Sequence, residues 1–185
     1  MKVGFRRPHP SFGLPNNPGG ADTLFRKAKE LRSHKHVDRG RPVAVVGMNH
    51  PLYTDPRKAL WPDPGSSGGH LYEMLRSRTG CTVQDYLQTF QRFNLVSGPR
   101  WDDMQGLASW QRMEADLIEN FDCIILLGRA VRRCAGIRAT DEIIITPNLI
   151  CLPHPSGLNR WYNDPINRAV VEILLEEVYT RAVGG

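Results

Sequence analysis

Two short segments, at residues 42–48 and 122–128, most constrain how this chain can fold, because the first is an uninterrupted apolar run and the second is one after Asp122. A run without polar alternation is typical of a strand that is buried on both faces, as strands are in parallel sheets. Two further strands are expected, one at residues 93–96 and one at either 143–145 or 149–152. The sequence therefore predicts a short, mainly parallel sheet of four strands.

Segments with helical periodicity separate these runs, so strands and helices alternate along the chain. Such alternation predicts an α/β domain with three layers, αβα, in which helices cover both faces of the sheet. We expect residues 1–20 to form an irregular arm and residues 21–185 to form one domain. The expected helices span residues 23–35, 70–76, 83–90, 106–120 and 165–182, and one more begins at Ala130. The core face of the helix at 106–120 is expected to hold Leu107, Trp110, Met113, Leu117 and Ile118.

The composition of the 185 residues is that of an ordinary globular protein, with 41% hydrophobic and 23% charged residues. The net charge of +5 is compatible with a polyanionic partner such as nucleic acid, although many basic proteins bind none. The N-terminal residues lack the apolar run of a signal peptide, and no stretch has the length needed to span a membrane. We therefore expect a cytoplasmic protein, or a nuclear one in a eukaryote.

The four cysteines, Cys81, Cys123, Cys134 and Cys151, are expected to be reduced and buried. They form no CxxC pair and lack the close spacing that the ligands of an iron–sulfur cluster require. No other group of side chains has the spacing of a metal site, so we expect neither a metal nor another cofactor.

Three polar side chains are expected at the carboxyl ends of strands, where parallel sheets bind their ligands. His154 lies between Pro153 and Pro155, which restrict the backbone and favour a single orientation of the imidazole. Asn49 follows the first apolar run, where it either caps the loop or positions water or a ligand. Asn94 interrupts an apolar strand, and its amide needs a partner, either the backbone or the edge of a pyrimidine.

The segment Gly128-Arg129-Ala130 follows a predicted strand as a phosphate-binding turn does. The full GxGxxG pattern and the Walker A motif are both missing from the sequence. We therefore interpret Gly128 as a point of close packing between a strand and a helix. Arg129, Arg132 and Arg133 are expected to form a solvated basic face.

Taken together, these segments resemble the uracil-DNA glycosylase superfamily. Gly47-Met48-Asn49 is similar to the first motif of the single-strand-selective monofunctional branch, and His154-Pro155-Ser156 to the second motif of the uracil-specific enzymes. Gly157-Leu158-Asn159-Arg160 is similar to the corresponding stretch of the mismatch-specific branch. Asn94 lies on a strand between the motifs, where the family places the Asn that reads the base. The resemblance covers about residues 42–160.

The resemblance implies a base-binding and catalytic group. Asn49 would position the attacking water, and His154 would donate a hydrogen bond to the pyrimidine oxygen on which negative charge builds. Asn94 would read the edge of the base. The family's stacking aromatic follows its first-motif Asn or Asp by about a dozen positions, which implies Trp61, twelve positions after Asn49. Gly47 and Met48 would complete the base-binding group.

The resemblance also implies a DNA-contacting loop. Leu158 would be the wedge that fills the space left by the extruded base, and Arg160 would support the opened duplex. Ser156, Gly157 and Asn159 of the same loop would contact DNA. The implied protein is a monomeric, monofunctional DNA glycosylase without a cofactor. It hydrolyses the N-glycosidic bond of uracil or a related pyrimidine in double- or single-stranded DNA and leaves an abasic site.

The sequence departs from the family after Asn49, within a long irregular segment that ends near Gly69. His50 stands where the family usually has Pro, and Pro51 where the uracil-specific branch has a bulky Tyr that excludes the methyl group of thymine. We therefore expect a pocket that admits 5-substituted pyrimidines. Two alternatives stay open: an enzyme of this fold that acts on a nucleotide or on a hypermodified base in viral or bacterial DNA, and a non-catalytic DNA-binding homologue.

Overall fold

The computed structural model describes residues 26, 42–49 and 55–184 and confirms the predicted α/β fold. The expected arm at 1–20, and the expected helix at 23–35 apart from the helical Arg26, lie outside the described residues. One sheet has the strand order β2-β1-β3-β5-β4, and all neighbouring pairs are parallel except β4 with β5. Its strands are β1 (Val43–Asn49), β2 (Phe90–Val96), β3 (Cys123–Leu127), β4 (Ile144–Ile145) and β5 (Leu149–Leu152).

The sheet has five strands where the sequence predicted four, because both candidates for the last strand are formed. β4 and β5 make an antiparallel hairpin in which Ile144 faces Cys151. Thr146 closes the turn: its backbone N–H donates to the carbonyl of Leu149, and its hydroxyl oxygen accepts from the Leu149 N–H at 3.0 Å. The two apolar runs, at residues 143–145 and 149–152, are close enough in sequence to pair with each other. The periodicity of the sequence cannot distinguish such a hairpin from a single strand at one of the two runs.

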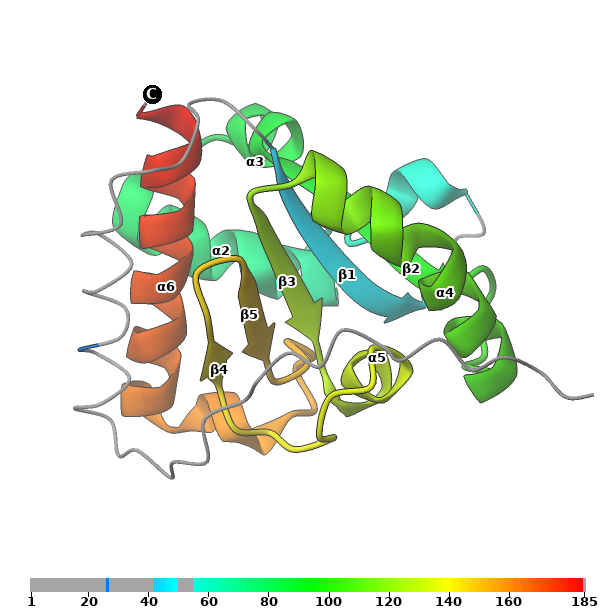
Figure 1. Ribbon diagram of the computed structural model, residues 1–185. Helices are drawn as coiled ribbons and strands as arrows, with labels where there is room; N and C mark the ends of the chain where they lie inside the picture. The colour runs from blue at the N-terminus through cyan, green and yellow to red at the C-terminus, as the bar shows by residue number, and fades with distance from the viewer. Residues whose placement is uncertain (1–25, 27–41, 50–54, 185) are drawn as a thin grey trace, which may run out of the picture.

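The helices form a layer on each face of the sheet (Figure 1). On one face lie α2 (Ser67–Thr79), α3 (Val83–Thr89) and α6 (Pro165–Val183), and on the other α4 (Asp103–Asn120) and α5 (Arg129–Cys134). Two 3-10 turns complete the described elements, η1 (Pro56–Lys58) and η2 (Arg160–Asn163). Successive residues of a strand point to opposite faces, so β1 contributes Val43 and Val45 to the first core and Ala44 and Val46 to the second.

A serine cap and a glycine set the two ends of α2, which begins earlier than its periodicity predicts. The hydroxyl of Ser66 accepts a hydrogen bond from the N–H of Gly69 at 2.9 Å, and Gly80, with a φ of 67°, ends the helix as predicted. A Cβ at Gly68 would lie 2.2 Å from the carbonyl oxygen of Leu60. The glycine therefore lets the first turn of α2 pack directly against the backbone that precedes it.

The expected core face of α4 is only partly buried. Trp110 and Leu117 are buried, and Met113 packs against the core, but Leu107 is 38% exposed and Ile118 is 49% exposed. The prediction was wrong for these two residues. Sequence periodicity defines a wide apolar stripe, and α4 packs mainly on β2 and α5, which cover only part of that stripe.

The predicted basic face of α5 is wrong for one of its three arginines. Arg132 is fully buried, and its guanidinium donates to the carbonyl oxygen of Glu142 at 2.6 Å. Arg129 and Arg133 are exposed as predicted and form ion pairs with Asp141 and Asp103. The side chain of Arg132 tethers the segment before β4, a long-range contact that local periodicity does not reveal.

All four cysteines are buried and free, as predicted. Burial raises the pKa of the Cys151 thiol to about 11 and that of Cys123 to about 12, so both stay protonated at neutral pH. In the described ranges, none of the helices combines the length and apolar character needed to cross a membrane.

Candidate functional site

The strand ends gather the predicted polar side chains on one face of the sheet. Asn49 is the last residue of β1 rather than the first of the loop, and Gly47 of β1 pairs in register with Asn94 of β2. Val45 and Phe90 belong to the core under α2 and α6, so the alternation of strand side chains places Gly47, Asn49 and Asn94 on that same face.

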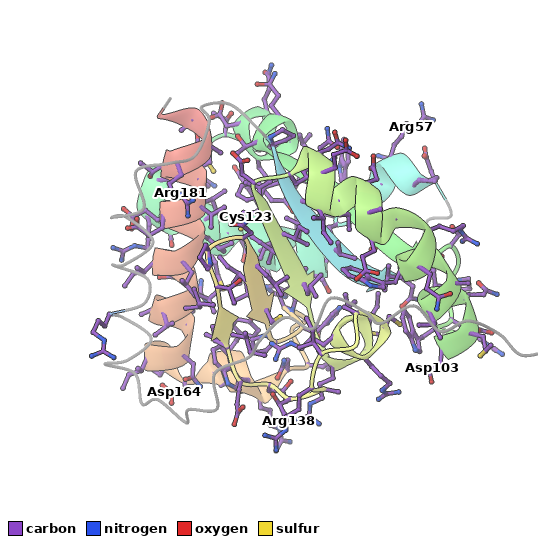
Figure 2. All side chains as sticks on the ribbon, in the orientation of Figure 1. Arg57, Asp103, Cys123, Arg138, Asp164 and Arg181 are labelled. Carbon is purple, nitrogen blue, oxygen red and sulfur yellow. The ribbon has the colours of Figure 1, made fainter. Side chains whose placement is uncertain are left out.

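His154 lies at the same end of the sheet, on the other side of β3. Leu152, the last residue of β5, belongs to the same core, and His154 follows it by two positions. In Figure 1 the carboxyl ends of the parallel strands lie toward the lower part of the molecule, where α5 begins. Figure 2 labels Arg138 on this lower side and Cys123, the first residue of β3, on the upper side.

Asn94 brings an unpaired polar atom to the site. Its Oδ1 is buried and has no hydrogen-bond partner in the described part of the chain. A Cβ at Gly47 would lie only 2.8 Å from this oxygen, so the glycine makes room for the amide. Buried amide oxygens are normally hydrogen-bonded. The Asn94 side chain can therefore accept a hydrogen bond from a ligand.

Asn49 is held by one end of its amide. Its Nδ2 donates to the carbonyl oxygen of Gly98 at 3.1 Å. Because a carbonyl can only accept, this contact assigns the nitrogen end of the amide, and no donor among the described residues bonds to Oδ1. An Asn in this state can orient a water molecule through its oxygen but cannot take up a proton as a carboxylate does.

His154 packs against Gly128, at the point where β3 ends. A Cβ at Gly128 would lie 2.9 Å from the Cβ of His154, and Gly128 has a φ of 87°, which favours glycine. The N–H of Gly128 also donates to the carbonyl oxygen of Leu152 at 2.8 Å. The sequence predicts close packing between a strand and a helix at Gly128, and this prediction is wrong, because the close neighbour of Gly128 is His154.

Burial lowers the pKa of His154. The imidazole is thus neutral at neutral pH, with one nitrogen as donor and the other as acceptor. Its backbone is fixed by Asn159, whose Nδ2 donates to the carbonyl oxygen of His154 at 2.9 Å. The proline-restricted histidine of the sequence therefore has a second restraint, from a residue five positions later.

The segment after His154 is anchored at its base and exposed at its tip. Asn159 Oδ1 accepts from the N–H of Trp161, and the hydroxyl of Tyr162 donates to the carbonyl oxygen of Pro153 at 2.8 Å. Leu158 is 94% exposed, and Arg160 is exposed beside it. We call residues 155–160 the wedge loop, after the role that the sequence resemblance implies for Leu158.

Trp61 follows a strained turn on the face of the sheet that holds Asn49 and Asn94. Leu60 before it has a φ of 45°, unusual for a residue with a side chain. The hydroxyl of the buried Tyr86 donates to the carbonyl oxygen of Leu60 at 3.1 Å, and Arg92 Nε donates to that of Ala59 at 3.2 Å. Strain that is held by buried contacts is typical of functional sites.

The Trp61 ring itself is partly buried, and cations lie near it. Lys58 Nζ lies 4.2 Å from the ring centroid, and the Arg92 guanidinium carbon lies 5.8 Å from it. Arg92 precedes Asn94 by two positions in β2, and so both side chains point to the same face of the sheet. Trp61 therefore lies on the side of the sheet that holds Asn49 and Asn94.

Other predicted site residues are placed differently. Met48 packs against the core under α4 and α5, so its side chain points away from Gly47 and Asn49. His50 and Pro51, the departures from the family motif, lie outside the described residues. Sequence reasoning missed Leu60, whose Cδ2 lies 3.1 Å from a Cβ built at Gly47. A leucine in a loop carries no signal that could have identified it.

β1 and β5 both neighbour β3, so Asn49 and His154 start from strands about 10 Å apart. Gly128 lies between them and has no side chain. Within the residues that the structure describes, no three His, Cys, Asp or Glu side chains come close enough together to hold a metal ion.

No protein-family model, no curated protein and no solved structure matches this chain. The chemistry of the strand-end site is therefore the basis for a functional conclusion.

Proposed function

We propose that the protein is a DNA glycosylase of the uracil-DNA glycosylase type, which hydrolyses the N-glycosidic bond of uracil or a related pyrimidine in DNA. One observation carries this proposal: Asn49, Asn94 and His154 come from three separate segments and lie at the carboxyl end of the sheet, the two asparagines on one face and His154 against Gly128 where β3 ends. Their free groups complement a flipped pyrimidine and a water molecule. The sequence resemblance assigns the same three residues to these tasks.

The proposed reaction begins with extrusion of the nucleotide, at a cost of a few kcal/mol. Leu158 offsets part of this cost by entering the space that the base leaves. The extruded base then lies beside Asn94, whose buried Oδ1 accepts from the ring N–H. Trp61 offers an aromatic surface for stacking.

Bond breaking transfers the electron pair of the C1′–N bond to the base. The sugar becomes cationic, and the base becomes an anion whose charge is carried largely by its oxygens. A neutral His154 donates a hydrogen bond to such an oxygen, and a fixed donor of this kind is worth about 3 kcal/mol in the transition state. Asn49 Oδ1 orients the water whose oxygen bonds to C1′, and the proton that this water loses balances the proton that the departing base takes up.

The test is single-turnover excision on oligonucleotides that contain uracil, a T mismatch, 5-hydroxymethyluracil or hypoxanthine, with abasic sites detected by alkaline cleavage. Asn49→Ala and His154→Ala should each lower the rate at least tenfold and leave DNA binding nearly unchanged. Asn120→Ala is the matched control, because this exposed amide bonds only to Asp116 within α4.

Three outcomes contradict the proposal. Rates that are unchanged in both variants remove Asn49 and His154 from the mechanism. Hydrolysis of free nucleotides without any action on DNA identifies an enzyme of another substrate class. Tight, salt-dependent binding of DNA without excision of any base in the panel identifies a non-catalytic DNA-binding protein.

A further inference from the structure

The loop that joins β2 to α4 contacts Asn49 through a backbone carbonyl. β1 and β2 are parallel, and Asn49, the last residue of β1, pairs in register with Val96, the last residue of β2. Gly98 follows Val96 by two positions, and its carbonyl oxygen accepts from Asn49 Nδ2 at 3.1 Å. The register of the two strands therefore brings this carbonyl to the side chain that would orient the attacking water.

Gly98 has a backbone conformation that other residues rarely adopt. Its φ is 124°, in the region that favours glycine, and the residue is buried. Apart from its two chain neighbours, no described residue has an atom within 4 Å of a Cβ built at Gly98. The glycine is therefore needed for its backbone conformation and not for a close neighbour. The carbonyl that bonds to Asn49 belongs to this turn of the chain after β2.

The Gly98 carbonyl restricts the chemistry of the side chain at position 49. A carbonyl oxygen can only accept, so the group that faces it must be a donor. The amide of Asn49 provides this donor with its nitrogen and leaves its oxygen for another partner. An ionised carboxylate has no donor, and it would place a charged oxygen against the carbonyl oxygen. The carbonyl favours the protonated acid instead, because only that form can donate a hydrogen bond.

We propose that Gly98 is a positioning residue that commits the site to a neutral, water-orienting side chain at position 49. The inference rests on the proposed function for its reaction, and it adds a residue that the base-reading and oxyanion-binding groups do not include. Gly98 acts only through Asn49. A carboxylate that takes up a proton from the attacking water typically accelerates a reaction by about 10²–10⁴-fold. The Gly98 carbonyl prevents this gain.

Asn49→Asp tests the restriction directly. A protonated carboxyl group reproduces the bonding of an amide, because its O–H donates to the Gly98 carbonyl and its other oxygen accepts from water. At about pH 7.5, single-turnover excision by this variant should be no faster than excision by the wild type. The rate of the variant relative to the wild type at the same pH should rise as the pH is lowered from about 8 to about 5. Division by the wild-type rate removes the contribution of His154 and of other groups that both proteins share.

The new carboxyl group also gives a readout that needs no substrate. An NMR titration of Asn49→Asp should place the pKa of this carboxyl above the ordinary aspartate value of about 3.9. In the loop after β2, the exposed cation Arg100 would lower this pKa, and the carboxylate of Asp102, which caps α4, would raise it. Adding Gly98→Ala keeps both charges and removes the carbonyl contact, so the pKa should then return toward its ordinary value.

Gly98→Ala alone tests the positioning of Asn49. An alanine cannot keep a φ of 124° without strain, so the carbonyl should turn and release the amide. The single-turnover rate should fall by about tenfold or more while the affinity for DNA stays nearly unchanged. Since Gly98 acts through Asn49, the double variant Gly98→Ala/Asn49→Ala should be no slower than Asn49→Ala.

Gly80→Ala is the matched control for backbone strain. Gly80 also has a positive φ, of 67°, but it caps α2, where its N–H bonds to the carbonyl of Arg76. Its substitution should leave the excision rate nearly unchanged, and denaturant unfolding verifies that each variant is folded. An Asn49→Asp variant that is faster than the wild type at pH 7.5, or whose new carboxyl has an ordinary pKa, overturns the inference. Rate losses that add up in the double variant also overturn it, because Gly98 would then act independently of Asn49.

The substrate-free titration separates this inference from the proposed function. If Gly98→Ala reverses a raised carboxyl pKa in Asn49→Asp but the wild type excises no base, the positioning by Gly98 stands and the glycosylase proposal fails. If the wild type excises a base and Asn49→Asp is faster with an ordinary carboxyl pKa, the glycosylase proposal stands and the role of Gly98 fails.

Discussion

At the scale of single residues, Gly128 controls the position of His154. We predict that Gly128→Ala lowers the free energy of unfolding and also cuts the excision rate at least tenfold. The new Cβ would lie 2.9 Å from that of His154, in a backbone with a φ of 87°. Denaturant unfolding measures the strain, expected at about 1–2 kcal/mol, and single-turnover excision measures the displacement of the imidazole.

Gly136→Ala supplies the comparison for that prediction. Gly136 has a φ of 69°, and no atom lies within 4 Å of a Cβ built there. Its substitution also strains a backbone with a positive φ, but it does not touch His154. Excision rates that fall equally in both variants contradict the role of Gly128 in holding the histidine.

The protonation of His154 gives a second prediction at this scale. Burial lowers its pKa below the ordinary value of 6.5. An NMR titration should therefore place the midpoint of the His154 imidazole below 6.5. Since the unfolded chain takes up this proton first, the histidine weakens stability as the pH falls through the folded pKa, and it has no such effect above pH 6.5.

Comparison with His154→Asn checks the direction of this pH dependence of stability. The wild type should lose more free energy of unfolding than the variant when the pH is lowered from about 7 to about 5. A midpoint above 6.5, or a wild type that gains stability relative to the variant in acid, contradicts the prediction.

At the scale of elements, the proposed function predicts that the wedge loop acts in opening the duplex and not in the chemical step. Leu158 is 94% exposed, while Asn159 and Tyr162 anchor the loop from below. Leu158→Ala should therefore leave the melting temperature unchanged and slow excision from duplex DNA more than from single-stranded DNA. Parallel assays on the two substrates measure the ratio, and equal slowing on both contradicts a wedge.

At the scale of the whole molecule, the positive charge is concentrated in the N-terminal part of the sequence. Residues 1–41 hold ten Lys and Arg against three Asp and Glu, a net charge of +7. Residues 42–185 hold 14 against 16, a net charge of −2, and the two parts add up to the +5 of the chain. Such asymmetry is typical of a basic segment that contacts a polyanion.

This distribution predicts which charges set the salt dependence of DNA binding. Neutralising Lys27, Lys29 and Arg32 together to Gln should reduce the slope of log affinity against log salt by about 2–3. Removing three charges from the domain, at Arg76, Arg112 and Arg181, is the matched control and should change the slope little. Equal effects of the two triple variants contradict a dominant role for the N-terminal charges.

Much of the architecture follows from local sequence patterns. The largely apolar segments at residues 42–48 and 122–128 identified two buried parallel strands, and Gly80 ended a helix as predicted. Because the carboxyl ends of parallel strands lie at the same edge of a sheet, identifying the strands also placed Asn49 and His154 at one edge. These features depend on residues within a few positions of one another, and a sequence displays such neighbours directly.

The contacts that shape the site depend instead on which strands become neighbours. Gly128 meets His154 because β5 lies beside β3, and Gly47 faces Asn94 because β2 lies beside β1. No local pattern encodes that order, nor the burial of Arg132 beneath the segment before β4. The sequence alone was enough to identify the polar residues at the strand ends. Tertiary structure decided which of them touch, because contact between distant segments arises only when the whole sheet is assembled.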